Sequence, residues 1–518
     1  MKNVIRLCSF IAFTFFSICT PLFANKDAAP AESISVLWVL PFVAILLCIA
    51  VIPLINAHFW EKNLWWISMG IFCVPMAVIF SVFMGDTLRH LSIEKAFEYI
   101  SFILLLASLY VISGGILIKG TIEGTPKVNV VFIFIGSIIA SFIGTTGASM
   151  LLIRPLIRAN EERKKKAHVI IFFIFLVSNI GGLLTPLGDP PLFLGYLQGI
   201  PFEWTFRLAP QWAVASIIVL CVFYLVDTIM YKKEGLSPSS GSAKPSPDIA
   251  GKITDTIRLL DVETKENEKK ISMKSLQKAR DNLTNIMQQV GGYSPAGSKK
   301  EKLGLEGRIN LVLLAGVVLI VFLQGLFVKK FGWWPSFGPQ EGGMALLLIL
   351  SLVVTPYKGD LRRRNAFTFG PIKEVAFLFA GIFASMIPAL YILEHNGAAL
   401  GVTQPWQFFW AAGGLSSFLD NAPTYLTFMS VAKGLNLPND LGFLLNDGGH
   451  LSSAALAAIS CGAVFMGANT YIGNGPNFMV KSIAEERGVK MPSFFGYMVY
   501  SMAVLIPTFI LITFLFFI

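Results

Sequence analysis

Two acidic residues lie inside long apolar stretches of this chain. Asp189 belongs to Gly188-Asp189-Pro190-Pro191, and Asp420 opens Asp420-Asn421-Ala422-Pro423. A charge at membrane depth costs about 2.5–3.5 kcal/mol on insertion scales, so such a group normally pairs, takes up a proton or binds an ion. A carboxylate in this setting can hold either a proton or a metal cation, which is the chemistry of cation–proton exchange. The alternative for either residue is that it caps a half-helix, because Asp close to Pro also forms turns.

Hydroxyl and amide side chains accompany the two carboxylates. Their oxygen atoms, together with the carbonyl groups of interrupted helices, are ligands for hard cations. Beyond Asp189 and Asp420, which we expect to bind sodium directly, the candidate cation and proton ligands are Thr145, Thr146, Ser149, Asn179, Thr185, Asn421, Thr424, Asn469, Thr470, Asn474 and Asn477. The alternative for each neutral residue is a hydrogen bond between helices, worth roughly 0.6 kcal/mol.

Glycine and proline predict breaks in the helices that carry these residues. No continuous helix survives the glycines and prolines between Gly181 and Pro191. The expected backbone breaks are Gly147, Gly182, Gly188, Gly467 and Gly473. A fixed-offset alignment of two of these stretches pairs Gly182 with Gly467, Thr185 with Thr470, Gly188 with Gly473, Pro191 with Pro476 and Asp189 with Asn474. The sequence therefore predicts an internal repeat.

Composition indicates that these stretches cross a membrane. Of 518 residues, 54% are hydrophobic and 14% are charged, whereas a soluble domain carries about 25% charged residues. The net charge of +10 comes from basic clusters between apolar blocks, which is typical of cytoplasmic loops and does not indicate nucleic-acid binding. We expect an all-α polytopic membrane protein in the lipid bilayer, neither an enzyme nor a nucleic-acid binder. The sequence has no phosphate-binding loop, so we expect secondary transport without a cofactor.

The first half predicts a hairpin among its crossings. Residues Asn129–Ile157 are too long for one ordinary span, and the basic cluster after them stays cytoplasmic only if the chain turns back at Gly144–Gly147. The predicted crossings are Val36–Ile55, Leu64–Met84 after a loop at His58–Asn63, Phe97–Ile118, His168–Leu194 and Gln211–Met230.

The second half repeats this pattern. Its hairpin covers Pro405–Val431, interrupted at Gly413-Gly414 and at Asp420. Its crossings are Ile309–Val328, Ala345–Pro356, Val375–Leu393, Ser452–Val480 and Phe494–Phe516. Each half thus has about five transmembrane helices plus one re-entrant hairpin, and an odd number of crossings makes the two repeats inverted, with broken helices at the midplane.

The domain organisation follows from this trace. Residues 1–24 read as a signal peptide, or alternatively as an uncleaved first helix. Residues 34–230 form the first membrane repeat, 231–308 a polar cytoplasmic loop and 309–518 the second repeat. The loop is a linker or a regulatory segment. We expect a multi-pass protein of a bacterial-type cell (inner) membrane, with its N-terminus outside after signal cleavage. His168 begins a helix beside the basic cluster, which favours an interfacial role over a proton relay.

Four motifs resemble the ion-transporter superfamily of citrate and dicarboxylate carriers, arsenite permeases and NhaD-type sodium/proton antiporters. They begin at Gly144 (GTTGASMLLIRPLIRAN), Ser178 (SNIGGLLTPLGDPPLFLG), Leu419 (LDNAPTYLTF) and Gly467 (GANTYIGNGPNF). The chain looks most like the NhaD-type antiporters and their citrate-transporter-like relatives. The resemblance implies a scaffold and a transport unit, allows a homodimer, and makes Asp189 and Asp420 the cation- and proton-handling pair. The Ser-Asn-Thr signature typical of dicarboxylate carriers is missing from both hairpin tips.

The leading hypothesis is therefore sodium (or lithium)/proton antiport, with these small inorganic ions as the transported species. Cation-coupled transport of citrate or another carboxylate is the second hypothesis, because helix N-termini at the breaks could hold an anion. Arsenite efflux is a third, and a membrane sensor that uses the polar loop is a fourth.

Overall fold

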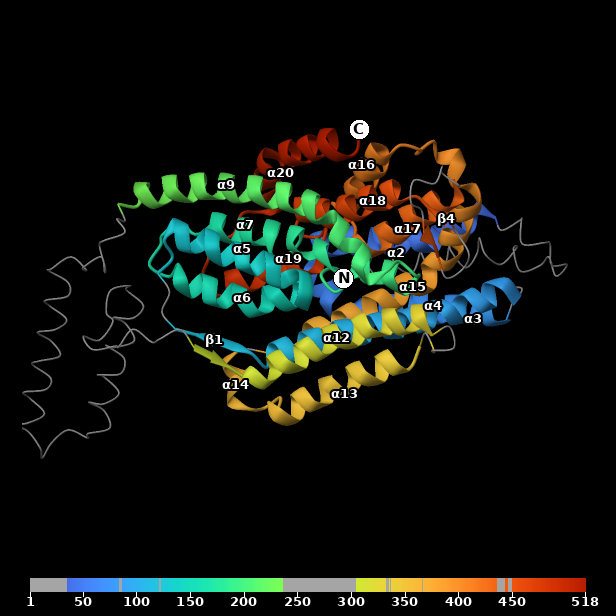
Figure 1. Cartoon of the computed structure of the whole chain (residues 1–518), viewed down its shortest axis with the longest axis horizontal. Helices are drawn as coiled ribbons and strands as arrows, with labels where there is room; N and C mark the ends of the chain where they lie inside the picture. Colours follow the sequence, from blue (N-terminus) through green and yellow to red (C-terminus); the bar gives the residue numbers. More distant parts are fainter. Residues whose placement is uncertain are drawn as a thin grey trace, which may run out of the picture.

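The computed structural model is built almost entirely of helices (Figure 1). It describes residues 35–82, 86–120, 123–235, 304–331, 335, 337–365, 367–435, 443–445 and 450–518. This part of the chain contains eight helices long and apolar enough to cross a membrane, and three shorter apolar helices. The protein is an all-α polytopic membrane protein, as the sequence predicts. The expected signal peptide and most of the expected polar loop lie outside the described residues.

The helices of the two halves follow one order. The first half contains η3 (Val36–Val39), α2 (Leu40–Trp65), the π-helical η4 (Trp66–Cys73), α3 (Val74–Val82), α4 (Asp86–Gly114), β1 (Leu117–Lys119), α5 (Pro126–Ile143), α6 (Thr145–Ala159), α7 (Ala167–Leu176), η5 (Ile180–Leu184), α8 (Pro190–Leu197), η6 (Phe202–Leu208) and α9 (Ala209–Lys233). The second half contains β2 (Gly304–Glu306), α12 (Arg308–Lys330), α13 (Pro339–Val354), α14 (Asp360–Arg364), α15 (Gly370–Asn396), η7 (Gly397–Leu400), α16 (Pro405–Ser416), α17 (Asn421–Gly434), β3 (Phe443–Leu444), β4 (His450–Leu451), α18 (Ser453–Met466), η8 (Gly467–Asn469), α19 (Gly475–Glu486) and α20 (Phe494–Phe516). Each half therefore ends with a helical pair, an interrupted helix and a long last helix.

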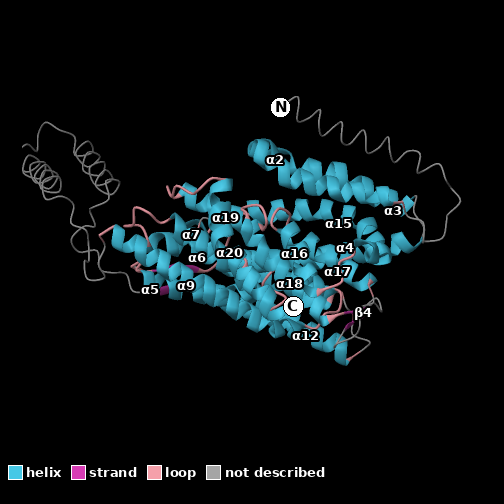
Figure 2. Ribbon diagram, turned by 90° about the horizontal axis from the view of Figure 1, so that it is seen from above, coloured by secondary structure: helices cyan, strands magenta, loops and turns pink. Residues whose placement is uncertain are grey.

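One group of helices combines α2, η4, α3 and α4 with α12, α13 and α15 through pairwise contacts, and Figure 1 shows α4, α12 and α13 next to one another. Figure 2 shows α2 and α3 on one side of α4 and α15, and α12 on the other. The expected loop at residues 58–63 is helical instead, because the chain breaks at Asn56, where φ is −155° and ψ is 88°. The side chain of Asn56 accepts the backbone N–H of Phe59 at 2.9 Å and so caps the next helical stretch.

Two short antiparallel ladders supplement the helices. Strand β1 pairs with β2, with Leu117 opposite Glu306, and so ties the end of α4 to the start of α12. Strand β3 pairs with β4. The β2 strand belongs to the last residues of the expected polar loop, which is therefore anchored to the first half at that end.

The first hairpin turns at a single residue. Helix α5 ends at Ile143 and α6 begins at Thr145, with Gly144 between them at φ 81°, a left-handed conformation that glycine adopts without strain. The break expected at Gly147 is wrong, because Gly147 lies within α6. An added Cβ there would lie 3.5 Å from Oγ of Ser113 on α4, which is an ordinary contact distance, so packing does not require glycine at this position.

The second hairpin opens between α16 and α17, at residues 417–420. The interruption expected at Gly413-Gly414 is wrong, because both glycines lie inside α16. Gly413 lets α16 approach α18 closely, since an added Cβ would lie 2.1 Å from Sδ of Met466. The first glycine of Gly413-Gly414 therefore serves helix packing and does not interrupt the helix.

The two interrupted helices share one backbone geometry. Thr185 and Thr470 follow the short 3₁₀ turns in extended conformations, with φ of −137° and −136°. Asp189 and Asn474 then precede α8 and α19, with φ of −140° and −149°. The offset found in the sequence is therefore an offset between structurally equivalent residues.

Glycine is required inside both breaks. An added Cβ at Gly188 would lie 2.1 Å from the carbonyl oxygen of Gly182. The equivalent Cβ at Gly473 would lie 2.6 Å from the carbonyl oxygen of Gly467. Real Cβ atoms do not approach backbone atoms this closely. In each break the chain therefore folds back so that two glycines contact each other through their backbones.

Candidate ion site

The side chain of Asp189 is only 1% exposed and accepts hydrogen bonds from three elements. Thr145 donates its hydroxyl to Oδ1 at 2.8 Å, and Asn421 donates its amide to Oδ2 at 2.7 Å. Asn474 adds a longer bond to Oδ1 at 3.3 Å. The carboxylate makes no capping bond to α8, so helix capping does not explain this residue.

The tips of both hairpins meet at this carboxylate. Thr145 is the first residue of α6 and Asn421 the first of α17, so two helix N-termini lie beside Asp189. The aligned peptide dipoles of a helix favour negative charge at this end. Figure 1 shows α5 and α6 toward one end of the molecule's long axis and α16 and α17 toward the other. The hairpins thus approach the site from opposite directions, as inverted repeats would.

A chain of buried amides joins the two breaks. Asn474 donates to Oδ1 of Asn179 at 3.1 Å, and Asn179 donates to Oδ1 of Asn477 at 2.7 Å. Asn477 in turn donates to the backbone carbonyls of Gly467 and Thr470 at 2.8 and 2.9 Å. Every link satisfies a buried polar group, and the bonds from Asn474 to Asn179 and from Asn179 to Asn477 connect the break of one half to the break of the other.

Hydroxyls lock each break to its own hairpin. Thr185 donates to the carbonyl of Ser141, and the equivalent Thr470 donates to the carbonyl of Ser417. Asn469 also reaches this hairpin, donating to Oγ of Ser417 at 2.9 Å. These three predicted site residues therefore position the breaks and do not touch Asp189.

Asp420 has a different role from Asp189. Its Oδ1 accepts the backbone N–H of Ala422 at 3.2 Å, and its carbonyl accepts the hydroxyl of Thr424 at 3.1 Å. Its half-buried side chain thus caps α17, the alternative that the sequence left open for this residue. Among the described residues, Asp189 accepts hydrogen bonds from both halves, whereas the hydrogen bonds that Asp420 accepts come from its own helix α17.

The remaining predicted residues lie near the first hairpin tip. Ser149 pairs with Ser178 through their hydroxyls at 2.8 Å, which joins α6 to the first break. Thr146 lines a small pocket that is partly open to solvent. Thr145 and Gly188 also line it, while α4 and α15 form its other, largely apolar wall. Asp189 does not line the pocket itself, but its chain neighbours Gly188 and Pro190 and its hydrogen-bond donor Thr145 do.

The arrangement suits a hard cation. In the described part of the chain no group of three or more His, Cys, Asp or Glu side chains is placed to hold a metal ion. The oxygen atoms that converge are the carboxylate of Asp189, the hydroxyl of Thr145 and the amide oxygen of Asn179.

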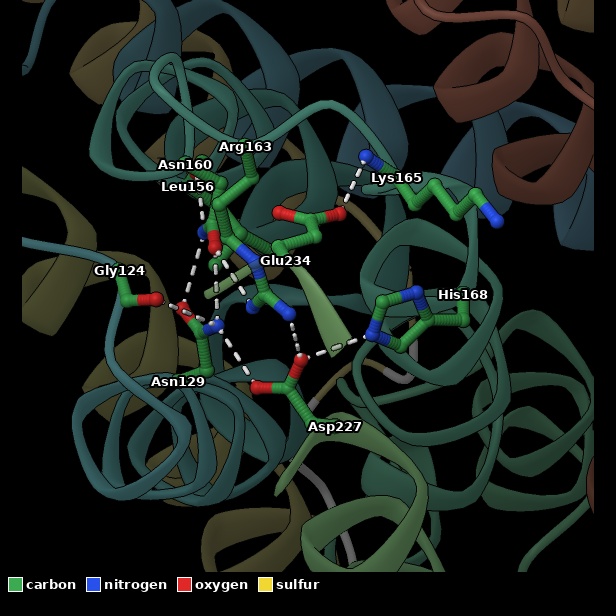
Figure 3. A network of polar contacts seen from close by, with 9 residues as sticks. All are labelled: Gly124, Asn129, Leu156, Asn160, Arg163, Lys165, His168, Asp227 and Glu234. Carbon is green, nitrogen blue, oxygen red and sulfur yellow. Dashed lines mark hydrogen bonds and ion pairs between the residues drawn. The ribbon is translucent and has the colours of Figure 1, made fainter. Parts of the chain in front are cut away.

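A second buried polar network, drawn in Figure 3, was not expected from the sequence. Asp227 of α9 is fully buried and pairs through Oδ1 with Arg163 at 2.6 Å and with Nε2 of His168 at 2.7 Å. Asn129 donates to its Oδ2 at 3.0 Å and exchanges two hydrogen bonds of 2.9 Å with Asn160. The network joins the start of α5, the end of α6, the start of α7 and α9.

This network corrects the expectation for His168. The ring is 4% exposed and bonded to a carboxylate, so it is not an interfacial side chain. A signal for the network was present, because Asp227 stands inside the predicted crossing Gln211–Met230, where a carboxylate needs a partner.

The helical fold and the buried polar centre define a polytopic membrane transport protein. The family model described as "Putative citrate transport" matches residues 31–264 and 278–517, which together make up most of the chain. The chain belongs to this family, and the likeness to citrate-transporter-like members of the ion-transporter superfamily is thereby confirmed. No curated protein matches the chain.

Proposed function

We propose that this protein exchanges sodium or lithium ions for protons, with Asp189 as the residue that holds either the cation or the proton. The observation that carries the proposal is the setting of Asp189: a buried carboxylate at the meeting point of both hairpins and both breaks. All three side chains that donate to it are neutral. A neutral shell leaves the negative charge of Asp189 free to be balanced by one cation or one proton at a time.

The neighbouring amides would adapt to either occupant. Asn421 and Asn474 direct their N–H groups at Asp189, while Asn179 presents an amide oxygen to Asn474. An amide that turns over replaces a donor by an acceptor, because its oxygen and nitrogen occupy similar positions. In this proposal the same side chains stabilise the free carboxylate by donation and a bound cation by acceptance.

The proposal places the protein in a bacterial-type cell membrane with its N-terminus outside, in monomeric or homodimeric form. Sodium or lithium and protons are its transported species, and no cofactor takes part.

Everted membrane vesicles test this function. A respiratory proton gradient is established, sodium or lithium chloride is added, and proton release is followed with a pH-sensitive dye. The proposal expects saturable release with both ions and none with choline chloride. Vesicles that hold the protein but release no protons at any pH from 6 to 9.5 would refute it.

Cation-coupled carboxylate transport is the second candidate, and the description of the matching family favours it. In that case the cation at Asp189 would be the coupling ion, and a carboxylate would move with it. Uptake of labelled citrate into cells that depends on a sodium gradient would support this candidate over simple exchange.

A further inference from the structure

Arg154, in the middle of α6, forms no ion pair within 4.0 Å with the residues that the structure describes. Its Nη1 atom is buried and has no hydrogen-bond partner among the described residues. Arg362 shows how this chain otherwise treats a buried guanidinium: its Nε donates to the carbonyl of Thr355 and its Nη1 to that of Val111, both at 2.6 Å. A buried donor without an acceptor is unfavourable, so Arg154 is poised for an acceptor from outside the chain.

The position of Arg154 connects it to the pocket beside the first hairpin tip. Gly147 lines this pocket and faces Ser113 on α4. Arg154 follows seven residues later, which is two helical turns along the same face of α6. Its charge also interacts with Tyr110 of α4, another residue of the pocket wall. Arg154 is not among the residues that line the pocket, but these two relationships place it at the edge that we call the mouth, while Thr145 lines the pocket and donates to Asp189.

A second arginine reinforces the positive charge at this mouth. Helix α19 packs against α6, and the charge of the exposed Arg487 at its end interacts with that of Arg154. Glu486 is the nearby carboxylate, but no ion pair forms between it and Arg154 within 4.0 Å in the described part of the chain. Two neighbouring guanidinium groups repel each other, and an anion between them would remove that repulsion.

We propose that Arg154, assisted by Arg487, binds the carboxylate group of a small organic anion at the mouth of this pocket. The inference rests on the second candidate function and assigns the anion a site of its own, separate from the cation at Asp189. The planar fork of a guanidinium matches the two oxygens of a carboxylate. Deeper in the pocket, the hydroxyl of Thr146 and the N-terminus of α6 offer donors, and the apolar wall from α4 and α15 accommodates a carbon skeleton.

Equilibrium binding of labelled citrate to the purified full-length protein, with and without sodium, tests the proposal. We expect saturable binding by the wild type and an affinity about tenfold or more lower in Arg154→Gln. Arg154→Lys keeps the charge but loses the fork, so its affinity should fall in between. The control is Arg158→Gln on the same helix, whose exposed side chain donates to the carbonyl of Ile118 at 2.7 Å. This control should bind citrate like the wild type.

Citrate binding that is equal in the wild type and Arg154→Gln would overturn the proposal, as would the lack of saturable binding by the wild type. Thermal melting and the vesicle assay show whether Arg154→Gln is folded, because sodium-dependent proton release does not need an anion site. Loss of citrate binding with proton release intact supports the site. Citrate binding that depends on Arg154 without any proton release would support the site and refute the exchange function.

Discussion

Asn421 donates its side-chain amide to the carboxylate of Asp189 at 2.7 Å, although 232 residues separate them in the chain. The bond joins the tip of the second hairpin to the broken helix of the first half. The single hydroxyl proton of Ser416 has two acceptors, the amide oxygen of Asn421 at 2.7 Å and the carbonyl oxygen of Ala463 at 2.6 Å, and donation to Asn421 directs the amide nitrogen at Asp189. The bond between Asn421 and Asp189 thus connects both repeats at one carboxylate.

Replacing this amide should weaken ion binding without unfolding the protein. In Asn421→Ala the Oδ2 atom of Asp189 loses its closest donor, and a bound cation loses a ligand-positioning group. We expect the sodium concentration for half-maximal exchange to rise about 10- to 100-fold, the range seen when groups that orient metal ligands are removed. Asn396→Ala, at an exposed site bonded within its own helix, is the control. An unchanged half-maximal concentration in Asn421→Ala would contradict the assignment.

If Asp420 only caps α17, substitutions of it should change the stability of the protein and leave ion exchange intact. Asp420→Ala removes the bond to the N–H of Ala422 and should lower the free energy of unfolding by about 1 kcal/mol. Asp420→Asn keeps a capping oxygen, so it should melt like the wild type and retain exchange. Differential scanning fluorimetry and the vesicle assay measure the two properties. If Asp420→Asn were stable but inactive, the carboxylate would have a role in ion handling beyond capping.

The network around Asp227 should contribute to stability more than to ion affinity. Asp227→Ala leaves Arg163 buried without its counter-charge, which typically costs 3–5 kcal/mol, so the melting midpoint should fall by several degrees. The double variant Arg163→Met/Asp227→Leu removes both charges and should regain part of the loss. The half-maximal sodium concentration of folded protein should stay near the wild-type value. A single variant as stable as the wild type would show that the network is not needed for folding.

The paired glycines of each break predict a sharp intolerance of side chains. Gly188→Ala places a Cβ against the carbonyl of Gly182 and must distort the break that positions Asp189, so exchange should be lost. Gly414→Ala in α16 is the matched control, because an added Cβ there meets nothing within 4 Å. Exchange by Gly188→Ala at the wild-type rate would show that this packing is not required.

The positions of the two breaks could be predicted because each depends on glycines that lie close together in the sequence. Gly182 and Gly188 recur as Gly467 and Gly473, and the structure gives both pairs the same role. The sequence predicts the turn of the first hairpin within Gly144–Gly147, and the structure places it at Gly144, but a cluster of small residues does not reveal which one adopts a positive φ.

Contacts between distant segments could not be predicted in the same way. The partners of Asp227 are Asn129, Arg163 and His168, which come from three segments outside α9, and no local pattern brings them to it. The contrast between the two predicted carboxylates was hidden for the same reason. Asp189 and Asp420 have similar sequence surroundings, and only the fold decides which one receives donors from both halves.

In the proposed mechanism the Asp189 carboxylate holds the exchanged ion. Sodium-driven proton flux in proteoliposomes that contain equal amounts of purified wild type and Asp189→Asn tests it most directly. The substitution preserves side-chain size but removes the charge that a cation or proton balances. We predict saturable flux for the wild type and none above empty liposomes for Asp189→Asn, with both proteins melting cooperatively. Flux by folded Asp189→Asn at the wild-type rate would contradict the claim.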